Sequence, residues 1–337
     1  MRIGINPEKH NNQLSIEHYH RVVIPVYIPN LEDNYFKDAL VILKLCFSSL
    51  LATIHNKTKI SIINNGSCNA VSAYLDELYR NNDSIDQLLY SKINLGKVNA
   101  LYSAIKSNIE PLITISDADV MFLPNWQEAV EKIFINFPEA GMISPVPSSL
   151  AYRSKFINST VYYGIIKGKI RFERVVSQEG LIKFEKSIGR KMYDDIHLEK
   201  YLTISNVKST AVIGCGHFVA TLRSEVFKSS PPEVSAHKIV GGSENLYFDI
   251  PNDKAGFLRL ATKDNYAYHL GNIFEPWMKD KINHILKQSK SKSLDIELPK
   301  GKPISKVQYN LGKLLYILFF KKFKSLYFRL KGVKVPY

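Results

Sequence analysis

Two aspartates one residue apart, Asp117 and Asp119, follow a short apolar segment at residues 112–116. The segment is rich in β-branched residues and predicts a buried strand, so the two aspartates lie where that strand ends. In an extended backbone, residues i and i+2 point to the same side, and both carboxylates can therefore converge on one point. A hard divalent cation with positions open for phosphate oxygens would suit that point. The alternative is an acidic turn, because aspartate is common in turns.

The segments that must position these carboxylates alternate between strand and helix patterns. Apolar, β-branched runs predict strands at residues 21–27, 59–63, 88–93 and 112–116. Apolar residues at helical spacing predict helices at residues 37–54, 71–79, 98–106 and 126–137. We expect the first strand to end at Pro25, because proline cannot donate to a central ladder. The alternation predicts an α/β fold in which helices cover both faces of a mostly parallel sheet.

Polar residues gather where three of these strands end. They lie at residues 25–27, 64–67 and 117–119. Ligands of open α/β sheets bind beyond the carboxyl ends of the strands, so this coincidence favours a ligand site over an isolated acidic turn. Gly96 and Lys97 open the helix at 98–106, where backbone N–H groups and the helix dipole favour an anion. The alternative for Lys97 is a solvated surface lysine.

The composition excludes several other classes of protein. With 337 residues, 45% of them hydrophobic, the chain can bury a substantial core. Its three cysteines are far apart and form no CxxC pair, so we expect neither a disulfide framework nor a zinc site. We therefore expect a reducing compartment. We expect no signal peptide, because the N-terminal residues include no apolar segment. No P-loop is present, which argues against an ATP-driven activity.

The net charge of +14 belongs largely to the last forty residues. Residues 298–337 carry ten Lys and Arg and no Asp or Glu, which leaves +4 for the rest of the chain. This distribution argues against a nucleic-acid partner. Residues 306–331 combine apolar side chains with lysines, a pattern typical of a basic amphipathic helix on an anionic membrane surface. The alternative is a C-terminal helix that packs its apolar side on the core or on a second subunit.

Four motifs occur in an order that resembles the nucleotide-binding half of a GT-A glycosyltransferase, most closely glycosyltransferase family 2. They are VVIPVY, IINNGS, INLGKVNAL and ISDADVMFLPNW. The similarity covers residues 21–146 and resumes at 212–272. It implies a Rossmann-like GT-A domain with a nucleotide-sugar-binding half at 21–146 and an acceptor-side half at 147–280. An N-terminal arm at 1–20 and a basic amphipathic C-terminal extension at 281–337 would flank this domain.

The resemblance implies a binding site for a nucleotide-sugar donor. Pro25, Val26 and Tyr27 would line the base and ribose, and Asn64 would face the base. The family usually has aspartate at the position of Asn64, so the identity of the base is open.

Other residues of the implied donor site would contact the phosphates and the sugar. Gly96 and Lys97 would contact the diphosphate, and Ala118 stands between the two aspartates of the family's DXD motif. Gly214 and Gly216 would allow close approach to the donor sugar and the acceptor. His217, in the same segment, could contact a substrate or pack in the core.

The resemblance also implies a metal site. Asp119 would ligate Mn²⁺ or Mg²⁺ directly, and Asp117 would reach the ribose or, through water, the metal. The cation would stabilise the charge on the departing diphosphate. His269 would supply a third metal contact or a hydrogen bond to the diphosphate, although a lone histidine is often structural.

The general base comes from a segment that departs from the family pattern. The spacing from Glu244 to residues 256–257 matches the family's acidic pair, but Asn245 stands where the aspartate is usual. An amide is no base at neutral pH. We therefore expect Glu244 to accept the proton of the acceptor hydroxyl, with Asp249 in reserve.

The resemblance implies a glycosyltransferase that moves a sugar from a nucleotide sugar to a glycan or lipid-linked acceptor in a metal-dependent, inverting reaction. We expect it to be cytoplasmic and peripheral on the inner face of the membrane. One alternative is a sugar nucleotidyltransferase, whose glycine-rich basic loop after the first strand is missing at residues 28–33. Another is a non-catalytic, membrane-associated glycan-binding protein.

Overall fold

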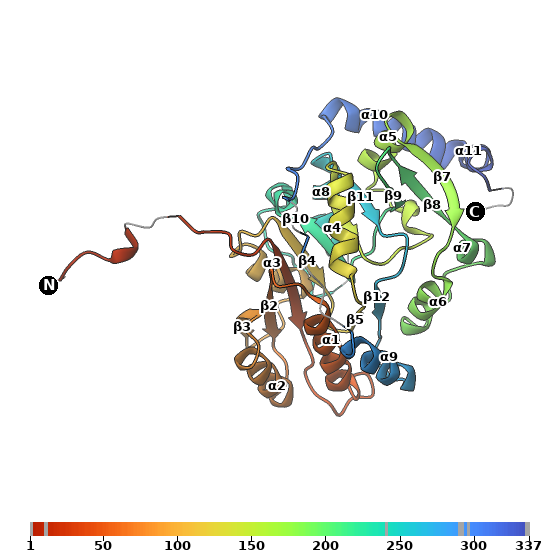
Figure 1. Ribbon diagram of the computed structural model, residues 1–337. Helices are drawn as coiled ribbons and strands as arrows, with labels where there is room; N and C mark the ends of the chain where they lie inside the picture. The colour runs from red at the N-terminus through yellow and green to blue at the C-terminus, as the bar shows by residue number, and fades with distance from the viewer. Residues whose placement is uncertain (1–2, 10–12, 240–241, 289–292, 295–296, 334–337) are drawn as a thin grey trace.

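The computed structural model describes the chain except residues 1–2, 10–12, 240–241, 289–292, 295–296 and 334–337. Its centre is a ten-stranded sheet in the order β3-β2-β1-β4-β10-β6-β11-β9-β8-β7, covered by helices (Figure 1). The strands of this sheet are β1 (His20–Val26), β2 (Thr58–Asn65), β3 (Ile85–Ser91), β4 (Leu112–Ser116), β6 (Ala140–Ser144), β7 (Lys169–Arg174), β8 (Lys200–Ser205), β9 (Thr210–Ile213), β10 (Val219–Arg223) and β11 (Leu258–Ala261). A second, two-stranded sheet pairs β5 (Val120–Phe122) with β12 (Ala267–His269).

The helices of the first half are α1 (Ala39–Thr53), α2 (Asn69–Arg80), α3 (Lys97–Ile105), α4 (Trp126–Asn136), α5 (Asn158–Ile166), α6 (Gln178–Ser187) and α7 (Asp195–Glu199). The later ones are the π-helical turn η4 (Asn245–Asp249), α8 (Ile250–Lys254), α9 (Pro276–Leu286), α10 (Lys306–Tyr316), the π-helical η5 (Ile317–Lys322) and α11 (Lys324–Leu330). Three short 3-10 helices complete the described structure: η1 (Pro7–Lys9), η2 (Ala151–Arg153) and η3 (Ser224–Ser229).

The directions of the strands confirm the prediction of a mostly parallel α/β sheet. The pairings β1–β2, β2–β3, β1–β4 and β6–β11 are parallel. Strand β10 lies antiparallel between β4 and β6, and β9, β8 and β7 extend the sheet with antiparallel pairs. All strands therefore run in one direction except β10, β9 and β7.

The expected end of the first strand at Pro25 is wrong. Strand β1 continues to Val26, and Pro25 pairs in register with Ile63 of β2. The pairing of β1 with β4 stops at Val23. Pro25 therefore lies beyond the ladder to β4, and its missing N–H costs the central sheet little.

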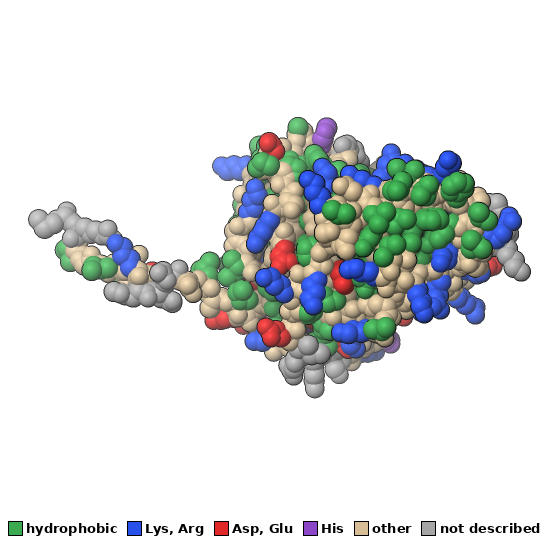
Figure 2. Space-filling view, turned by 90° about the horizontal axis from the view of Figure 1, so that it is seen from above, with side chains coloured by type: hydrophobic (Ala, Val, Ile, Leu, Met, Phe, Trp, Pro, Cys, Tyr) green, Lys and Arg blue, Asp and Glu red, His purple; other side chains and the backbone are tan. Residues whose placement is uncertain are grey.

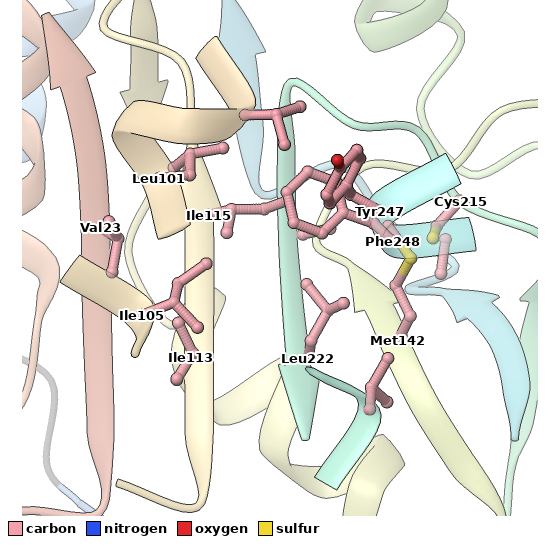
Figure 3. Packing of buried hydrophobic residues seen from close by; sticks show 14 of the residues in the cluster. Val23, Leu101, Ile105, Ile113, Ile115, Met142, Cys215, Leu222, Tyr247 and Phe248 are labelled. Atoms are coloured by element: carbon pink, nitrogen blue, oxygen red, sulfur yellow. The ribbon is translucent and has the colours of Figure 1, made fainter. Parts of the chain in front are cut away.

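Apolar residues on one face of the central strands pack against α3 and η4 (Figure 3). Ile113 and Ile115 of β4 lie with Leu101 of α3, and Tyr247 and Phe248 of η4 close the cluster. Each fully buried side chain of this size contributes roughly 1.5–3 kcal/mol to the free energy of folding. The packing fixes η4 over the sheet, and with it the segment from Glu244 to Asp249 in which the sequence predicts the general base.

The opposite face of the sheet is covered by α1 and α4. Val22 and Ile24 of β1 point to this side, because alternate residues of a strand face opposite ways. They pack with Phe47 of α1 and Trp126 of α4. Helices therefore cover both faces, as the sequence predicts.

The C-terminal helices pack on α5 through one side only. Tyr316, Phe320, Tyr327 and Phe328 are buried in the cluster that includes Val161 of α5. Among the described residues, no helix is both long and apolar enough to cross a bilayer.

A buried polar network ties α4 to the amino end of β1. Glu131 Oε1 accepts from His20 Nδ1 at 2.8 Å and from His55 Nε2 at 2.9 Å, and Glu131 Oε2 accepts from the Tyr19 hydroxyl at 2.9 Å. His20 Nε2 lies 2.7 Å from Thr114 Oγ1. Burial alone would raise the pKa of Glu131, but the hydrogen bonds from both histidines outweigh it and lower this pKa to about 2.

Replacing this carboxylate should destabilise the fold. Glu131→Ala removes the acceptor shared by two buried histidines and the half-buried Tyr19, so we expect the free energy of unfolding at pH 7 to fall by about 3 kcal/mol or more. Urea unfolding followed by circular dichroism measures this change. Glu128→Ala on the same helix is the matched control, since its ion pair with Lys132 lies at the surface and should cost less than about 0.5 kcal/mol. Equal midpoints for the two variants would contradict the role of Glu131.

The same network predicts how stability responds to acid. Burial lowers the pKa of His20 below its ordinary value, although the bond from Glu131 opposes this, so the unfolded chain takes up a proton first as the pH falls below about 6.5. Glu131 stabilises the fold fully above its unfolded pKa of about 4.5, and this contribution disappears as the pH falls toward 2. Both effects lower stability in acid.

Candidate active site

The two aspartates lie at the carboxyl edge of β4, held by neighbouring strands on both sides. The backbone N–H of Asp117 donates to the carbonyl of Phe218 at 2.8 Å, and the carbonyl of Asp119 accepts from Leu270 at 2.8 Å. Strand β12 pairs with β5 so that His269 lies opposite Val120. The chain thus brings a segment 150 residues downstream beside the acidic pair.

The carboxylates of Asp117 and Asp119 and the imidazole of His269 converge. One potential ligand atom from each lies within 4.8 Å of the others, and Asp119 Oδ2 is 3.4 Å from His269 Nε2. The side chains are 27%, 31% and 15% exposed, respectively, so the group opens to solvent. The structure therefore brings the two aspartates and this histidine together.

Ser187 fixes which nitrogen of His269 can bind a cation. The hydroxyl of Ser187 donates to the carbonyl of Phe184 at 2.8 Å, so its oxygen is left to accept from His269 Nδ1, 3.0 Å away. In the neutral ring, Nε2 then carries a lone pair directed at Asp119. A lone pair facing a carboxylate is satisfied by a cation between them, and this donor set fits a divalent metal ion.

Burial raises the pKa of Asp119, and the negative charge of Asp117 raises it further, against the opposing effect of His269. Two carboxylates held this close repel each other in the absence of a positive charge. A cation at this point would relieve the repulsion.

Lys97 supplies one positive charge directly. Its Nζ lies 2.5 Å from Asp117 Oδ1 and 2.6 Å from Glu244 Oε1. Burial lowers the pKa of this ammonium group, but the two carboxylates more than offset that effect and raise it above its ordinary value. Lys97 is therefore a charged residue of the site rather than a solvated surface lysine.

The start of α3 differs from the free anion site that the sequence suggests. The N–H of Lys97 donates to the carbonyl of Lys238 at 2.9 Å. Gly96 has φ +84°, and a Cβ there would lie 2.7 Å from the carbonyl of His237. The segment around His237 and Lys238 thus covers the helix start, so a diphosphate contact would come from the Lys97 side chain.

The two candidates for the general base have different surroundings. Glu244 is 28% exposed and forms an ion pair with Lys97. Asp249 is only 1% exposed, and its Oδ1 is shared by Arg259 at 3.0 Å and His217 at 2.7 Å. The structure does not support Asp249 as a direct base, because its carboxylate is enclosed by these two partners.

The residues expected to hold the nucleoside differ in how exposed their side chains are. Tyr27 is 42% exposed and lies against Phe36, so its ring is available to a ligand. Val26 points into the core, and only its backbone could line a site. Asn64 is buried, its amide donates to Ser72 Oγ at 2.8 Å, and its oxygen accepts from Ser67 N–H at 2.9 Å. Asn64 therefore stabilises the turn after β2.

The two glycines of the segment between β9 and β10 have different roles. A Cβ at Gly214 would lie 2.7 Å from the carbonyl of Ala151, so this glycine allows close approach of the chain to itself. Gly216 has open space and lines a pocket of about 350 Å³ together with His217 and Asn245. The pairing of His217 with Asp249 was not predicted, since a separation of 32 residues shows no sequence pattern.

A second group of potential metal ligands, His20, His55 and Glu131, is fully buried at the amino end of β1. His55 Nδ1 lies 3.1 Å from Thr58 Oγ1, and the remaining donors and acceptors pair as described above. These side chains satisfy one another and form a structural network.

Comparison with known proteins supports the motif assignment. Residues 34–175 match the family model described as glycosyl transferase family 2. No curated protein sequence matches the chain.

Two solved structures illustrate the likeness among many that match. The mannosyltransferase PcManGT from Pyrobaculum calidifontis, in complex with GDP-Man and Mn²⁺, is 12% identical with a TM-score of 0.41, over 73% of this chain and 55% of that one. TarS residues 1–349 from S. aureus, in complex with UDP-GlcNAc, is 14% identical with a TM-score of 0.42, over 91% of this chain and 75% of that one. The chain thus spans little more than half the length of the mannosyltransferase structure.

The family match includes β2, β3, β4 and the acidic pair, and it leaves out the segments that carry Glu244 and His269. The matched segment, less than half of the chain, is thus similar to glycosyl transferase family 2.

Proposed function

We propose that this protein transfers a sugar from a nucleotide-sugar donor to a hydroxyl group of a glycan or lipid-linked acceptor, with Mn²⁺ or Mg²⁺ as cofactor. The observation that carries the proposal is the convergence of Asp117, Asp119 and His269 beside the charged Lys97. Two carboxylates and an imidazole suit a cation, and a cation with a lysine suits a diphosphate.

Asp119 and His269 would hold the metal ion, and Asp117 would contact it directly or through water. When bound, the ion supplies positive charge for the departing diphosphate. The ammonium group of Lys97 lies beside Asp117 and would add a hydrogen-bond donor for the phosphate oxygens. Tyr27 offers a ring face for the nucleoside at the end of β1.

We further propose a single displacement with inversion at the anomeric carbon. The acidic pair and Lys97 assemble around one leaving group, and Glu244, the other carboxylate beside them, is held in an ion pair with Lys97. A direct attack by the acceptor hydroxyl inverts the configuration.

A thermal-shift screen tests the donor site. We would incubate the protein with UDP-glucose, UDP-galactose, UDP-N-acetylglucosamine and GDP-mannose, each with and without Mn²⁺. A ligand that binds the native state raises the melting temperature, and we expect at least one donor to do so only when Mn²⁺ is present. Absence of any donor-induced shift would contradict the proposed function.

The C-terminal helices present a second apolar side, turned away from the core. The exposed apolar side chains of this surface, here called the outer face, are Val307, Leu311, Leu314, Ile317, Phe323, Leu326 and Leu330. On α10 the first three recur at i, i+4 and i+7, opposite the buried Gly312 and Tyr316. Seen from above, a broad hydrophobic area is flanked by Lys and Arg (Figure 2).

We propose that the outer face lies on an anionic membrane surface. The basic residues along these helices and at the end of α11 are Lys306, Lys313, Lys321, Lys322, Lys324, Arg329 and Lys331. Each contributes on the order of 1 kcal/mol near an anionic bilayer, in addition to burial of the apolar side chains. Such a surface is typical of the cytoplasmic leaflet, and the three cysteines are free thiols. We therefore propose a cytoplasmic location, peripheral on the inner face of the membrane.

Changing the outer face should release the protein from lipid. Deleting the helices would uncover the core around Tyr316 and Phe320, so we choose the triple substitution of Leu311, Leu314 and Ile317 by Ser. We expect at least a tenfold loss of flotation with vesicles of phosphatidylglycerol and phosphatidylethanolamine. Substitution of the exposed Val207 and Ile273 by Ser is the control and should leave flotation unchanged. Equal flotation of wild type and the triple variant would refute the membrane proposal.

A further inference from the structure

We propose that His217, oriented by Asp249, is the general base that deprotonates the acceptor hydroxyl. This proposal rests on the proposed glycosyl transfer and assigns a role within it. It answers a question that the sequence leaves open, because Asn245 occupies the position where an aspartate base is expected.

The geometry of the pair is that of a positioned base. His217 Nε2 lies 2.7 Å from Asp249 Oδ1, so Nε2–H donates to the carboxylate and Nδ1 carries the lone pair. Among the described residues, no group hydrogen-bonds to Nδ1. The imidazole is 24% exposed, whereas Asp249 is 1% exposed. One nitrogen is thus anchored inside the protein and the other is open.

Arg259 holds Asp249 in place. Its guanidinium lies 3.0 Å from Asp249 Oδ1 and also donates to the carbonyl of Cys215 and to Ser154 Oγ, each at 2.9 Å. Arg259 is fully buried, so the negative charge of Asp249 has a fixed counter-charge. A buried Arg–Asp pair with a partly exposed histidine is costly to build for packing alone.

His217 lines a pocket of about 350 Å³ together with Cys215, Gly216, Asn245 and Asp249. Residues next to these in the chain contact the donor site. Phe218, the neighbour of His217, accepts from the backbone N–H of Asp117. Glu244, the neighbour of Asn245, bonds to Lys97. The pocket is thus connected to the site of the leaving diphosphate through adjacent residues of the chain, at 217–218 and at 244–245.

Glu244 is less suited to the role. Its Oε1 lies 2.6 Å from the ammonium group of Lys97, which also binds Asp117. This oxygen of Glu244 is therefore already engaged with Lys97, whereas Nδ1 of His217 has no hydrogen-bond partner among the described residues.

The step balances as follows. His217 Nδ1 takes the proton of the acceptor hydroxyl while the oxygen attacks the anomeric carbon and forms the new glycosidic bond. The bond between that carbon and the diphosphate oxygen breaks, and the diphosphate leaves with the electron pair. The imidazolium that forms is stabilised by Asp249.

Charged and titratable groups around His217 set its pH response. Asp249 faces Nε2, and Arg259 lies behind Asp249. Lys155 and Cys215 also line the pocket. A general base accepts a proton only in its unprotonated form, so transfer should decline in acid.

The test compares His217→Gln, Asp249→Asn and the control His284→Gln, a change at an exposed position of α9. Each is assayed for Mn²⁺-dependent hydrolysis of the four donors, where water takes the place of the acceptor, and for donor-induced thermal shift. We expect His217→Gln to lower kcat/KM by 10²–10⁴ while the donor-induced shift persists. The acid limb of the pH profile should be lost. Asp249→Asn should lower kcat/KM and move the acid limb to lower pH.

The outcomes separate the two proposals. Suppose that donors shift the melting temperature but that His217→Gln hydrolyses them within twofold of the wild-type rate, or keeps the acid limb of the pH profile. Either result would overturn the role of His217 and leave the proposed function intact. Donor binding without hydrolysis by the wild type would equally contradict a working base here. Absence of both binding and hydrolysis would overturn the proposed function itself, and the base with it.

Discussion

Asp119→Ala should abolish metal-dependent turnover and leave the fold intact. The carboxylate of Asp119 lies at the centre of the three potential ligands, and its removal deletes the charge that would hold the cation beside the leaving diphosphate. We expect a fall of about 10³-fold or more in kcat, measured as Mn²⁺-dependent release of nucleoside diphosphate.

The control for this variant is Asp280→Ala, at an exposed position of α9, which should retain wild-type turnover. Circular dichroism should show wild-type folding for both variants. Substantial turnover by Asp119→Ala at saturating Mn²⁺ would remove Asp119 from the metal site.

Lys97→Met should give the second largest loss of activity. The ammonium group is the counter-charge for both Asp117 and Glu244, and it is the side chain placed to contact the diphosphate. A methionine preserves much of the length of the side chain without the charge, so we expect kcat/KM to fall by about 10²-fold.

Steady-state kinetics over a range of donor concentrations measures this effect. Lys92→Met, an exposed lysine shortly before the helix, is the matched control and should leave kcat/KM unchanged. Activity of Lys97→Met within threefold of wild type would show that Lys97 serves only the stability of the apo site.

Local patterns were enough to predict the first half of the sheet and the acidic pair. β-Branched runs and helical spacing depend on neighbouring residues, and they place β1, β2 and β4 with α1 and α3 to within a few residues. The error at Pro25 has a long-range cause, since whether proline is tolerated there depends on where β4 stops pairing.

The contacts that assemble the site could not be read in the same way. Lys97 and Glu244 are 147 residues apart, and His217 and Asp249 are joined only because η4 packs across the sheet. Asn64 shows the converse case, because a turn-forming residue and a ligand-binding residue look alike in sequence. In the structure, the hydrogen bonds of the Asn64 amide to Ser72 and Ser67 show the turn-forming role.

The C-terminal helices illustrate a limit of periodicity. The sequence left open whether their apolar residues face lipid or the core. The structure shows apolar residues on two opposite sides of α10, one buried on α5 and one exposed. A helix with two apolar stripes fits both interpretations from sequence alone. Only the contact with α5 shows which stripe is buried in the core.

The proposed transfer depends on a divalent cation that binds beside Asp119. Titration of the protein with Mn²⁺ in the presence of UDP or GDP, with free Mn²⁺ followed by electron paramagnetic resonance, measures this binding directly. We predict one bound Mn²⁺ per chain in the wild type and its loss in Asp119→Ala. Equal Mn²⁺ binding by the two proteins, or none by the wild type with either nucleotide, would contradict it.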